Sequence, residues 1–468
     1  MEPLLPILMF VTLAALLFTG FPVAFVLAGV AVIFGFLGIA LDLFNIQMFF
    51  AFVPRIWDGI ANTLILTAIP LFIFMGTMLE RSGVAAELLH CLQIWLRRVP
   101  GGLALAVTLI GTVMAATTGI IGASVVMMTL LALPVMLERS YSPRLATGTI
   151  AASGTLGILI PPSIMLIFMA HLLQQKLGTL FAAAVLPGLM LAGLYLIYIS
   201  VLCGFRPSLA PPLPEDEQAV SITELLRRTA FGVLPPVFLV FLVLGSILFG
   251  WTTPTEAAGV GAAGALLLAG LYKPAVDAFR NRTGIAAEFK SFLSGLPDVV
   301  ERTALTNAML FMILIGATAF AFVFRALGGD DVILSLVEGL GLGSWGFLIL
   351  LMGLVFLLGF FFDWIEITLI VLPVFAPIIN GMDFGDHVAR ADMLYWFAIL
   401  LAVNLQTSFL TPPFGFALFY MKGAAAELVR LNDIYRGIIP FVILQLIGLA
   451  LIMAFPEIAL WLPGKLLN

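Results

Sequence analysis

Apolar stretches of about 20 residues recur along the whole chain and constrain its fold more than any other feature, since a helix needs roughly 20 mostly apolar residues to cross a bilayer. Short polar loops separate these stretches, and no part of the 468 residues reads as a hydrophilic domain. With 62% hydrophobic and 10% charged residues, the composition excludes a soluble protein. We therefore predict an all-α polytopic membrane protein that is surrounded by lipid and functions within or close to the bilayer.

The apolar beginning of the chain is expected to belong to the mature protein. Residues 4–19 have no basic region before them, and they continue through Gly20 and Pro22 into a second apolar stretch that ends near Ala40. The pattern fits one long broken span or two short spans, so it leaves the side of the N-terminus open.

The basic residues fall into two groups of loops, which predicts the orientation of the chain. Most of the 21 lysines and arginines lie near residues 81–98, 139–144, 206–228, 273–302 and 422–436. The others, in loops that are acidic overall, are Arg55, Lys176, Arg325, Arg390 and Lys465. Because loops rich in Lys and Arg stay in the cytoplasm, the first group is predicted to lie inside. Residues 101–137 and 344–380 must then each enter and leave on one side, as re-entrant hairpins.

One series of elements occurs twice. Each copy has a span, a short amphipathic arm helix, a hairpin, a span interrupted by two prolines and a last span. The matching landmarks are Pro134 and Pro373 at the hairpin ends, and the pairs Pro161–Pro162 and Pro412–Pro413 in the interrupted spans. The arm helices carry charges of opposite sign, which indicates that the copies face opposite sides. Inverted repeats with interrupted helices are typical of secondary transporters.

This repeat predicts the division of the chain. We expect N-terminal membrane spans at 1–59, a first repeat at 60–203, connecting spans and cytoplasmic linkers at 204–299, an inverted second repeat at 300–457 and a C-terminal tail at 458–468. The first repeat contains a hairpin at 101–137 and a broken helix at 145–175. The second contains an arm helix at 331–342, a hairpin at 344–380 and a broken helix at 393–422. Polar linkers that contain proline are expected at 204–230 and 272–298.

The doubled prolines predict two cation sites. Proline has no N–H, so each pair leaves carbonyls of the preceding helical turn without donors. These carbonyls belong to Gly157 and Ile158 in the first repeat, and to Ser408 and Phe409 in the second. Free carbonyls are tolerated in a bilayer only inside protein or in a wet cavity, and backbone oxygens bind hard cations such as Na⁺.

Small and hydroxyl residues near the prolines and at the hairpin tips are candidates for the transport path. They are Thr118, Ser124, Ser153, Thr155, Asn404 and Thr407. Hydroxyl groups also satisfy the backbone of their own helix or join two helices, so their presence alone is a weak signal.

Two acidic residues lie within the second hairpin, at Asp363 and Glu366. Ionisable residues at membrane depth are functional candidates, and a spacing of three places both on one helical face. The alternative for Asp363 is the cap of the helix that returns from the hairpin tip. The sequence weighs these two roles about equally for Asp363 and favours a transport role for Glu366.

Several motifs resemble one family of membrane proteins. They are "GFPVAF" at 20–25, "TTGIIGASVVMMTLLALPVM" at 117–136, "TIAASGTLGILIPPSIMLI" at 149–167, "TPTEAAGVGA" at 253–262 and "VNLQTSFLTPPFGFALF" at 403–419. The chain resembles the large membrane subunit of tripartite ATP-independent periplasmic (TRAP) transporters, and the resemblance covers nearly its whole length. It departs from the commoner pattern at Thr118–Ile121, where a more serine-rich turn is usual, and at Ser408, where glycine is frequent.

The resemblance implies a Na⁺-driven elevator in a bacterial inner membrane that imports an organic acid. It also implies two partners, a small four-helix membrane subunit and a periplasmic substrate-binding protein, and no nucleic acid. No segment of this sequence resembles the small subunit, so a separate chain is expected. The periplasmic partner would set the initial selectivity, which leaves the acid unnamed.

The resemblance also implies two sodium sites. One uses backbone oxygens of Gly157, Ile160 and Pro162 with the hairpin tip near Thr118. The other uses Gly359, Ser408, Thr411 and Phe414.

Two other functions are open to such a chain. The first is a stand-alone sodium- or proton-coupled carrier of dicarboxylates or other anions, in which Asp363 and Glu366 could carry protons. The second is an intramembrane enzyme, which would need His171 to reach Ser124 or Ser153. His171 falls towards a loop, so an enzyme is not expected. Neither the two cysteines nor the three histidines are spaced as metal ligands, and no organic cofactor is expected.

Overall fold

The structure of the chain is a computed structural model. It describes residues 4–118, 121–212, 223, 226–227, 229–281, 284–339, 341–412, 415–425 and 428–466. Every regular element in these ranges is helical. A helix satisfies its own backbone polar groups, which is what a lipid environment demands.

The first half of the chain begins with two helices and a run of short turns. These are α1 (Leu4–Leu17), α2 (Val23–Ala40), η1 (Ile46–Ala51), α3 (Phe52–Ile56), η2 (Trp57–Ala61) and η3 (Leu64–Thr67). Longer helices follow. They are α4 (Ala68–Arg81), α5 (Val84–Trp95), α6 (Gly102–Thr118), α7 (Ile121–Glu138), α8 (Pro143–Thr155), η4 (Leu156–Ile158), α9 (Ile164–Leu173), α10 (Leu177–Phe205) and η5 (Pro207–Leu209).

The second half contains the longest helix, α15, and a second run of helices. The connecting elements are η7 (Thr229–Val233), α12 (Leu234–Leu248), α13 (Pro254–Leu267), η8 (Leu268–Tyr272) and α14 (Lys273–Asn281). The others are α15 (Ile285–Ala326), α16 (Gly329–Gly339), α17 (Ser344–Leu358), α18 (Trp364–Gly381), η9 (Gly385–His387), α19 (Met393–Ser408), α20 (Phe416–Ala425), α21 (Leu431–Ala454) and α22 (Glu457–Leu466).

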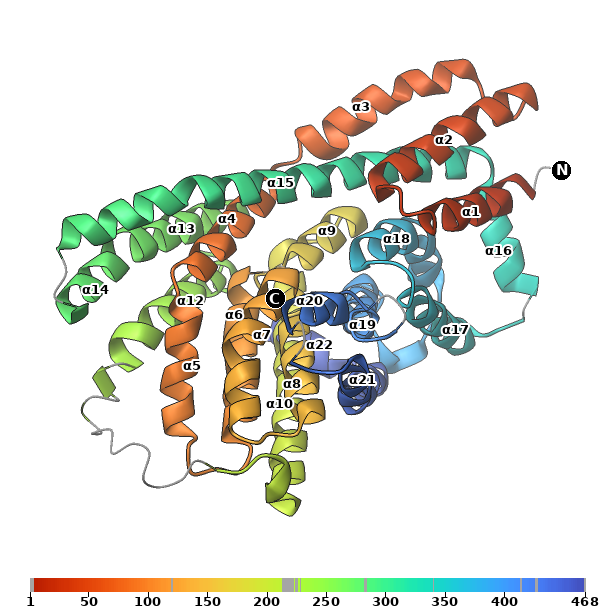
Figure 1. Cartoon of the computed structure of the whole chain (residues 1–468). Coiled ribbons are helices and arrows are strands. Elements are labelled where there is room, and N and C mark those ends of the chain that lie inside the picture. Colours follow the sequence, from red (N-terminus) through yellow and green to blue (C-terminus); the bar gives the residue numbers. More distant parts are fainter. Residues whose placement is uncertain are drawn as a thin grey trace.

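Eight helical segments of the described ranges are long and apolar enough to cross a membrane. They are Val23–Ala40, Leu64–Arg81, Leu177–Phe205, Thr229–Leu248, Pro254–Ala278, Ile285–Ala326, Trp364–Gly381 and Leu431–Ala454. Figure 1 shows α15 running along most of the molecule, with α2 against its C-terminal half and α4 and α14 against its N-terminal half. The bundle of α6, α7, α8 and α10 lies next to the group formed by α17 to α21.

The two ends of the segment that holds α6 and α7 lie close together. The Gly101 amide donates to the Ala210 carbonyl over 3.0 Å, and the Ser142 amide donates to the Leu209 carbonyl over 2.8 Å. Both partners belong to one short turn after α10. The segment therefore returns to the place where it starts, which is the geometry of a hairpin.

The two ends of the segment that holds α17 and α18 also meet. The Trp345 ring lies 5.3 Å from the ring of Phe384 and 6.1 Å from that of Trp396. The Trp396 indole N–H donates to the Ile452 carbonyl, near the end of α21, over 3.0 Å. Each hairpin is thus anchored beside the end of the long helix that closes its own half of the chain.

The two halves pack against each other reciprocally. Helix α7 of the first half contacts α20 of the second, and α18 of the second contacts α9 of the first. In the same way, α8 contacts α21 and α10 contacts α19. Most of these partners lie more than 200 residues apart in the sequence, so the two halves form one interlocked body.

Helices α8 and α21 approach each other closely at two glycines. A Cβ atom on Gly148 would lie 2.1 Å from the carbonyl oxygen of Gly437, and a Cβ on Gly437 would lie 2.3 Å from that of Arg144. Small residues let helices in a membrane bring their backbones together and gain packing contacts. These positions therefore require glycine.

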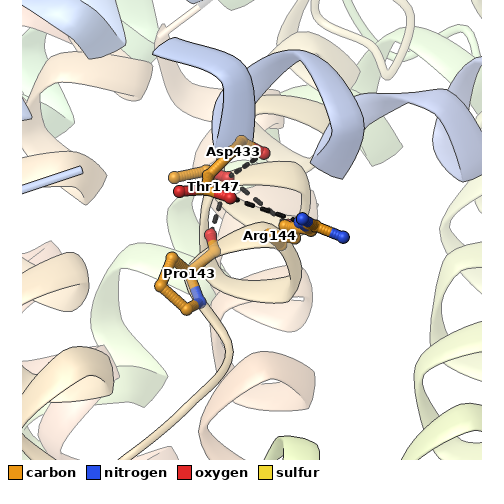
Figure 2. A network of polar contacts seen from close by, with 4 residues as sticks. All are labelled: Pro143, Arg144, Thr147 and Asp433. Atoms are coloured by element: carbon orange, nitrogen blue, oxygen red, sulfur yellow. Dashed lines mark hydrogen bonds and ion pairs between the residues drawn. The ribbon is translucent and has the colours of Figure 1, made fainter. Parts of the chain in front are cut away.

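Polar contacts join the same two helices at the start of α8 (Figure 2). The Arg144 side chain forms an ion pair with Asp433 over 3.2 Å. The Thr147 hydroxyl donates to the Pro143 carbonyl over 2.8 Å and lies 3.5 Å from the Asp433 carbonyl. Because the ion pair is partly exposed, the glycine contact contributes more to holding these helices together.

The beginning of the chain forms two separate helices. Helices α1 and α2 contact each other. The turn between them passes through Gly20, whose φ of +81° is a conformation that glycine adopts without strain.

Most of the polar linker expected at 272–298 is helical, and the expected boundary at residue 299 falls inside α15. Charged residues of this segment are paired with residues far away in the sequence. Arg81 lies 2.7 Å from Asp298, and Lys273 lies 2.8 Å from Glu87. Likewise, most of the expected tail at 458–468 is helix α22, which packs against α10.

Candidate functional site

The first proline pair lies in a gap between two helices. Helix α8 ends at Thr155, the short turn η4 follows, and α9 begins at Ile164. The Ser163 hydroxyl donates to the Ile158 carbonyl and so replaces one of the lost donors. In a helix, the Gly157 carbonyl would accept a hydrogen bond from residue 161, but Pro161 has no N–H. The described part of the chain supplies no other backbone donor to this carbonyl.

The second proline pair follows the same rule. Helix α19 ends at Ser408, and α20 begins at Phe416. The Ala417 amide donates to the Phe409 carbonyl over 3.2 Å, while the described residues supply no backbone donor to the Ser408 carbonyl. In both gaps one freed carbonyl is satisfied from the next helix and the other is left available. Pro413 and Phe414 lie outside the described residues.

Gly359 and Ser408, which the motifs place in one sodium site, lie against each other. A Cβ atom on Gly359 would be 2.1 Å from the Ser408 hydroxyl oxygen. That hydroxyl is buried and has no hydrogen-bond partner within the described ranges. Thr411, which follows Ser408 closely in the sequence, is also buried, and its hydroxyl donates to the Thr407 carbonyl over 2.9 Å. The end of α17 is thus packed tightly against the gap after α19, beside a buried hydroxyl oxygen that has no partner among the described residues.

Each interrupted helix is tied to the first helix of its own hairpin by a polar contact. The Ser153 hydroxyl on α8 donates to the Thr108 hydroxyl on α6 over 3.3 Å. The Asn404 amide on α19 donates to the Met352 carbonyl on α17 over 2.7 Å. Ser153 and Asn404 stand at the same distance before their proline pairs, so the two contacts correspond.

Two of the other hydroxyl candidates, Thr155 and Thr407, bond to their own helices in this structure. Thr155 donates to the Ala152 carbonyl, and Thr407 donates to the Asn404 carbonyl. Ser124 is buried on α7. Thr118 ends α6, but its side chain and residues 119–120 lie outside the described part, so its role in a sodium site stays a prediction.

A cavity of about 780 Å³ lies where both hairpin tips and both helix gaps meet. The first residues of four helices line it: Ile121 of α7, Ile164 of α9, Trp364 of α18 and Phe416 of α20. A helix N-terminus carries a partial positive charge and favours an anion. We call this space the central cavity.

The side chains of the central cavity are mostly apolar, and aromatic rings are frequent among them. They include Phe18, Phe21, Phe25, Phe361, Phe362, Trp364, Phe409, Phe416 and Tyr420. Asp363 and Glu366 are its two charged residues, and its lining, taken over the residues the structure describes, has neither lysine nor arginine. An anion in this cavity must therefore be held by helix N-termini, by hydrogen bonds or by a bound cation.

The family of this chain is shown by a match that spans nearly its whole sequence. The family model described as "Tripartite ATP-independent periplasmic transporter, DctM component" matches residues 10–458. The chain belongs to this TRAP transporter family. It is accordingly a multi-pass inner membrane protein of a transport system, and its relatives are permeases and not enzymes.

Named relatives of this TRAP protein take different substrates. The chain is 31% identical to the C4-dicarboxylate TRAP transporter large permease protein DctM of Pseudomonas aeruginosa, over 86% of each chain. It is 25% identical to the sialic acid TRAP transporter large permease protein SiaM of Vibrio cholerae, over 97% of each. Among solved structures, the YdaH transporter of Alcanivorax borkumensis superposes with a TM-score of 0.57, covering 91% of each chain at 14% identity, which shows a shared fold.

Asp363 and Glu366 of this TRAP subunit form a capping box at the start of α18. The Trp364 amide donates to Asp363 over 2.7 Å, and the Asp363 amide donates to Glu366 over 3.1 Å. The structure thus gives a structural role to both residues, including Glu366, for which the sequence favoured transport. Since both also line the central cavity, a second role in transport stays a prediction.

Substitutions of Glu366 should separate capping from charge. Glutamine can accept the same hydrogen bond, so Glu366→Gln should leave the thermal unfolding midpoint of the purified protein nearly unchanged. Glu366→Ala removes the acceptor and should lower the stability by about 1 kcal/mol. Equal losses in both variants would show that the charge, and not the cap, stabilises the hairpin tip.

The sequence did not indicate that the connection between α1 and α2 lines the central cavity of this TRAP protein. Gly20, Phe21 and Pro22 do so, together with Thr306 on α15. The motif at 20–25 marked this connection as a family feature but carried no chemical signal. Gln406 was missed as well, although its amide is buried without a partner among the described residues.

Proposed function

We propose that this chain is the large permease subunit of a sodium-coupled TRAP transporter that imports an organic acid by an elevator mechanism. The acid would be delivered by a periplasmic substrate-binding protein, and a separate small membrane subunit would complete the permease. The observation that carries the proposal is the central cavity, because both hairpin tips and both helix gaps open onto it. The N-termini of α7, α9 and α20 there favour a carboxylate even without a basic side chain, whereas that of α18 is already capped by Asp363 and Glu366.

Sodium coupling is supported by the oxygen atoms that the two gaps leave available. The carbonyls of Gly157 and Ser408 lack helical donors, and the Ser408 hydroxyl is buried without a partner among the described residues. Oxygen atoms of this kind suit Na⁺, which would compensate negative charge close to the acid. Ile160, Pro162, Gly359 and Thr411 are the further residues that we propose for the two sites.

The elevator mechanism is supported by the reciprocal packing of the two halves. The hairpins and interrupted helices interlock and enclose the proposed sodium sites, as expected for a transport domain built from inverted repeats. Helices α2, α4 and α15 pack together beside this domain and would form the scaffold. Helices α5 and α16 follow α4 and α15 directly and would be the arms that join scaffold and transport domain.

The stand-alone carrier is supported less well. The family is described as tripartite, and relatives at up to 31% identity are named as large permease proteins. Their printed substrates include dicarboxylates and sialic acid, which agree in carrying a carboxylate. An organic acid is therefore the proposed class of substrate.

Uptake into proteoliposomes tests the proposed function. Vesicles containing the chain and its small subunit should accumulate the acid that is bound to the periplasmic protein, and only under an inward Na⁺ gradient. In addition, NaCl should raise the unfolding temperature of the purified permease more than KCl at equal ionic strength, because Na⁺ binds the folded state. Equal uptake with K⁺ alone would contradict sodium coupling, and uptake by this chain without its partners would support the stand-alone carrier.

A further inference from the structure

A second cavity, of about 1110 Å³, lies further along α15 than the central cavity. Ile313 lines the central cavity, while Leu314 and Ala317 line the second one. Its other walls come from the region of α3, the end of α9 and helix α18. The two cavities are therefore neighbours between the proposed scaffold and the proposed transport domain.

The charges of the two cavities are opposite. Arg55, Arg325 and His171 line the second cavity, and Asp58 is the one acidic residue in its lining as the structure describes it. The central cavity instead has Asp363 and Glu366. We call the second space the arginine cavity, after Arg55 and Arg325.

Both arginines of this cavity lie at one face of α15, Arg325 as part of that helix and Arg55 from α3. The Arg55 guanidinium stacks over the Phe322 ring, 4.3 Å from its centroid. Phe322 and Arg325 are three residues apart on α15 and hence adjacent on its surface. Stacking fixes the plane of a guanidinium and leaves its N–H groups, which lie at the edge, free to bind an anion.

Arg325 is held in place by only part of its hydrogen-bonding capacity. One terminal nitrogen donates to the Pro373 carbonyl on α18 over 2.5 Å. That carbonyl is available because Pro377, four residues later, has no N–H. Asp330 lies 3.7 Å from the Arg325 Nε, and the side chain is still 46% exposed. Since a guanidinium has five N–H donors, Arg325 can be anchored and still bind a carboxylate.

We propose that the arginine cavity is a second anion site, in which Arg55 and Arg325 bind the carboxylate of an organic acid next to the central cavity. The site holds the acid between its release from the periplasmic protein and its entry into the central cavity. The identity of the anion rests on the proposed function, whereas the presence of an anion site rests on the two arginines. A lipid phosphate has related chemistry and is the alternative source of an anion.

The test is a crystal structure of the permease complex, the chain with its small subunit, soaked with 4-bromobenzoate. Anomalous scattering from bromine should locate the probe in the arginine cavity, separately from any probe in the central cavity. Arg55→Gln and Arg325→Gln should each reduce its affinity about tenfold or more, because each removes a charge-assisted hydrogen-bond donor. Lys176→Gln is the matched control, since Lys176 is an exposed basic residue outside this cavity and should not change binding.

Three results would overturn the inference. The first is the absence of bromine from the arginine cavity of the unmodified complex. The second is an unchanged affinity for 4-bromobenzoate in both arginine variants. The third is a lipid phosphate in the arginine cavity that the probe does not displace. Crystals grown with and without added phosphatidylglycerol distinguish the lipid from the acid. If Na⁺-driven uptake is intact while the cavity binds no probe, this inference fails and the proposed function stands. If the probe binds but uptake ignores Na⁺, the proposed function fails and the anion site stands.

Discussion

Gly359→Ala should raise the Na⁺ concentration needed for half-maximal uptake by about tenfold or more, which corresponds to roughly 1.4 kcal/mol of lost Na⁺ binding. The added Cβ would lie 2.1 Å from the Ser408 hydroxyl oxygen and 3.1 Å from the Ser408 Cα, so the end of α17 and the gap after α19 must separate. Because Na⁺ binding depends on fixed positions of the coordinating oxygen atoms, this separation should disturb the proposed sodium site at Gly359 and Ser408. Uptake into proteoliposomes as a function of Na⁺ concentration measures the effect.

The matched control for this change is Gly353→Ala on the same helix. A Cβ at Gly353 meets no atom within 4 Å, so its Na⁺ dependence should equal that of the unmodified protein. Both variants must elute as folded protein from a sizing column. If Gly359→Ala folds and keeps the original Na⁺ dependence, Gly359 and Ser408 do not belong to a sodium site.

Gly148→Ala should destabilise the protein by about 3 kcal/mol, the upper part of the range for overpacked interiors. The new Cβ would lie 2.1 Å from the Gly437 carbonyl oxygen and 2.6 Å from its carbon, and backbone atoms cannot move aside as a flexible side chain can. Helices α8 and α21 would have to separate, although alanine favours a helix more than glycine does. Unfolding of the purified protein by heat or by a denaturing detergent measures the loss.

Gly193→Ala, on α10, provides the comparison. No atom lies within 4 Å of a Cβ at this position, so the substitution should be neutral or slightly stabilising. Equal stability of the Gly148 and Gly193 variants would mean that α8 and α21 are not packed as closely as the structure has them.

The positions of the two helix gaps could be predicted from the sequence because their cause is local. Proline removes a donor wherever it stands, so the pairs at 161–162 and 412–413 indicated the affected carbonyls without any knowledge of the fold. The structure adds that Ser163 and Ala417 replace one donor in each gap. That compensation could not be foreseen, since it depends on how the next helix begins.

Other features depend on contacts between distant parts of the chain. The segment at 272–298 looked like a polar linker because Lys273 and Asp298 were read without their partners, Glu87 and Arg81. The pairing of Gly359 with Ser408 came from a family resemblance and not from the local sequence. The lining of the central cavity by the connection after α1 has no local signal, since its residues are apolar like most of the chain.

The interlocking of the two halves also bears on how this protein is made. Helix α8 completes its packing only against α21, and α7 and α9 do so only against α20 and α18. During synthesis the first half enters the membrane before these partners have left the ribosome. The face of α8 around Gly148 therefore stays exposed to lipid or to the insertion machinery until residues beyond 431 arrive. The first half must therefore stay in the membrane without part of its final packing while the second half is synthesised.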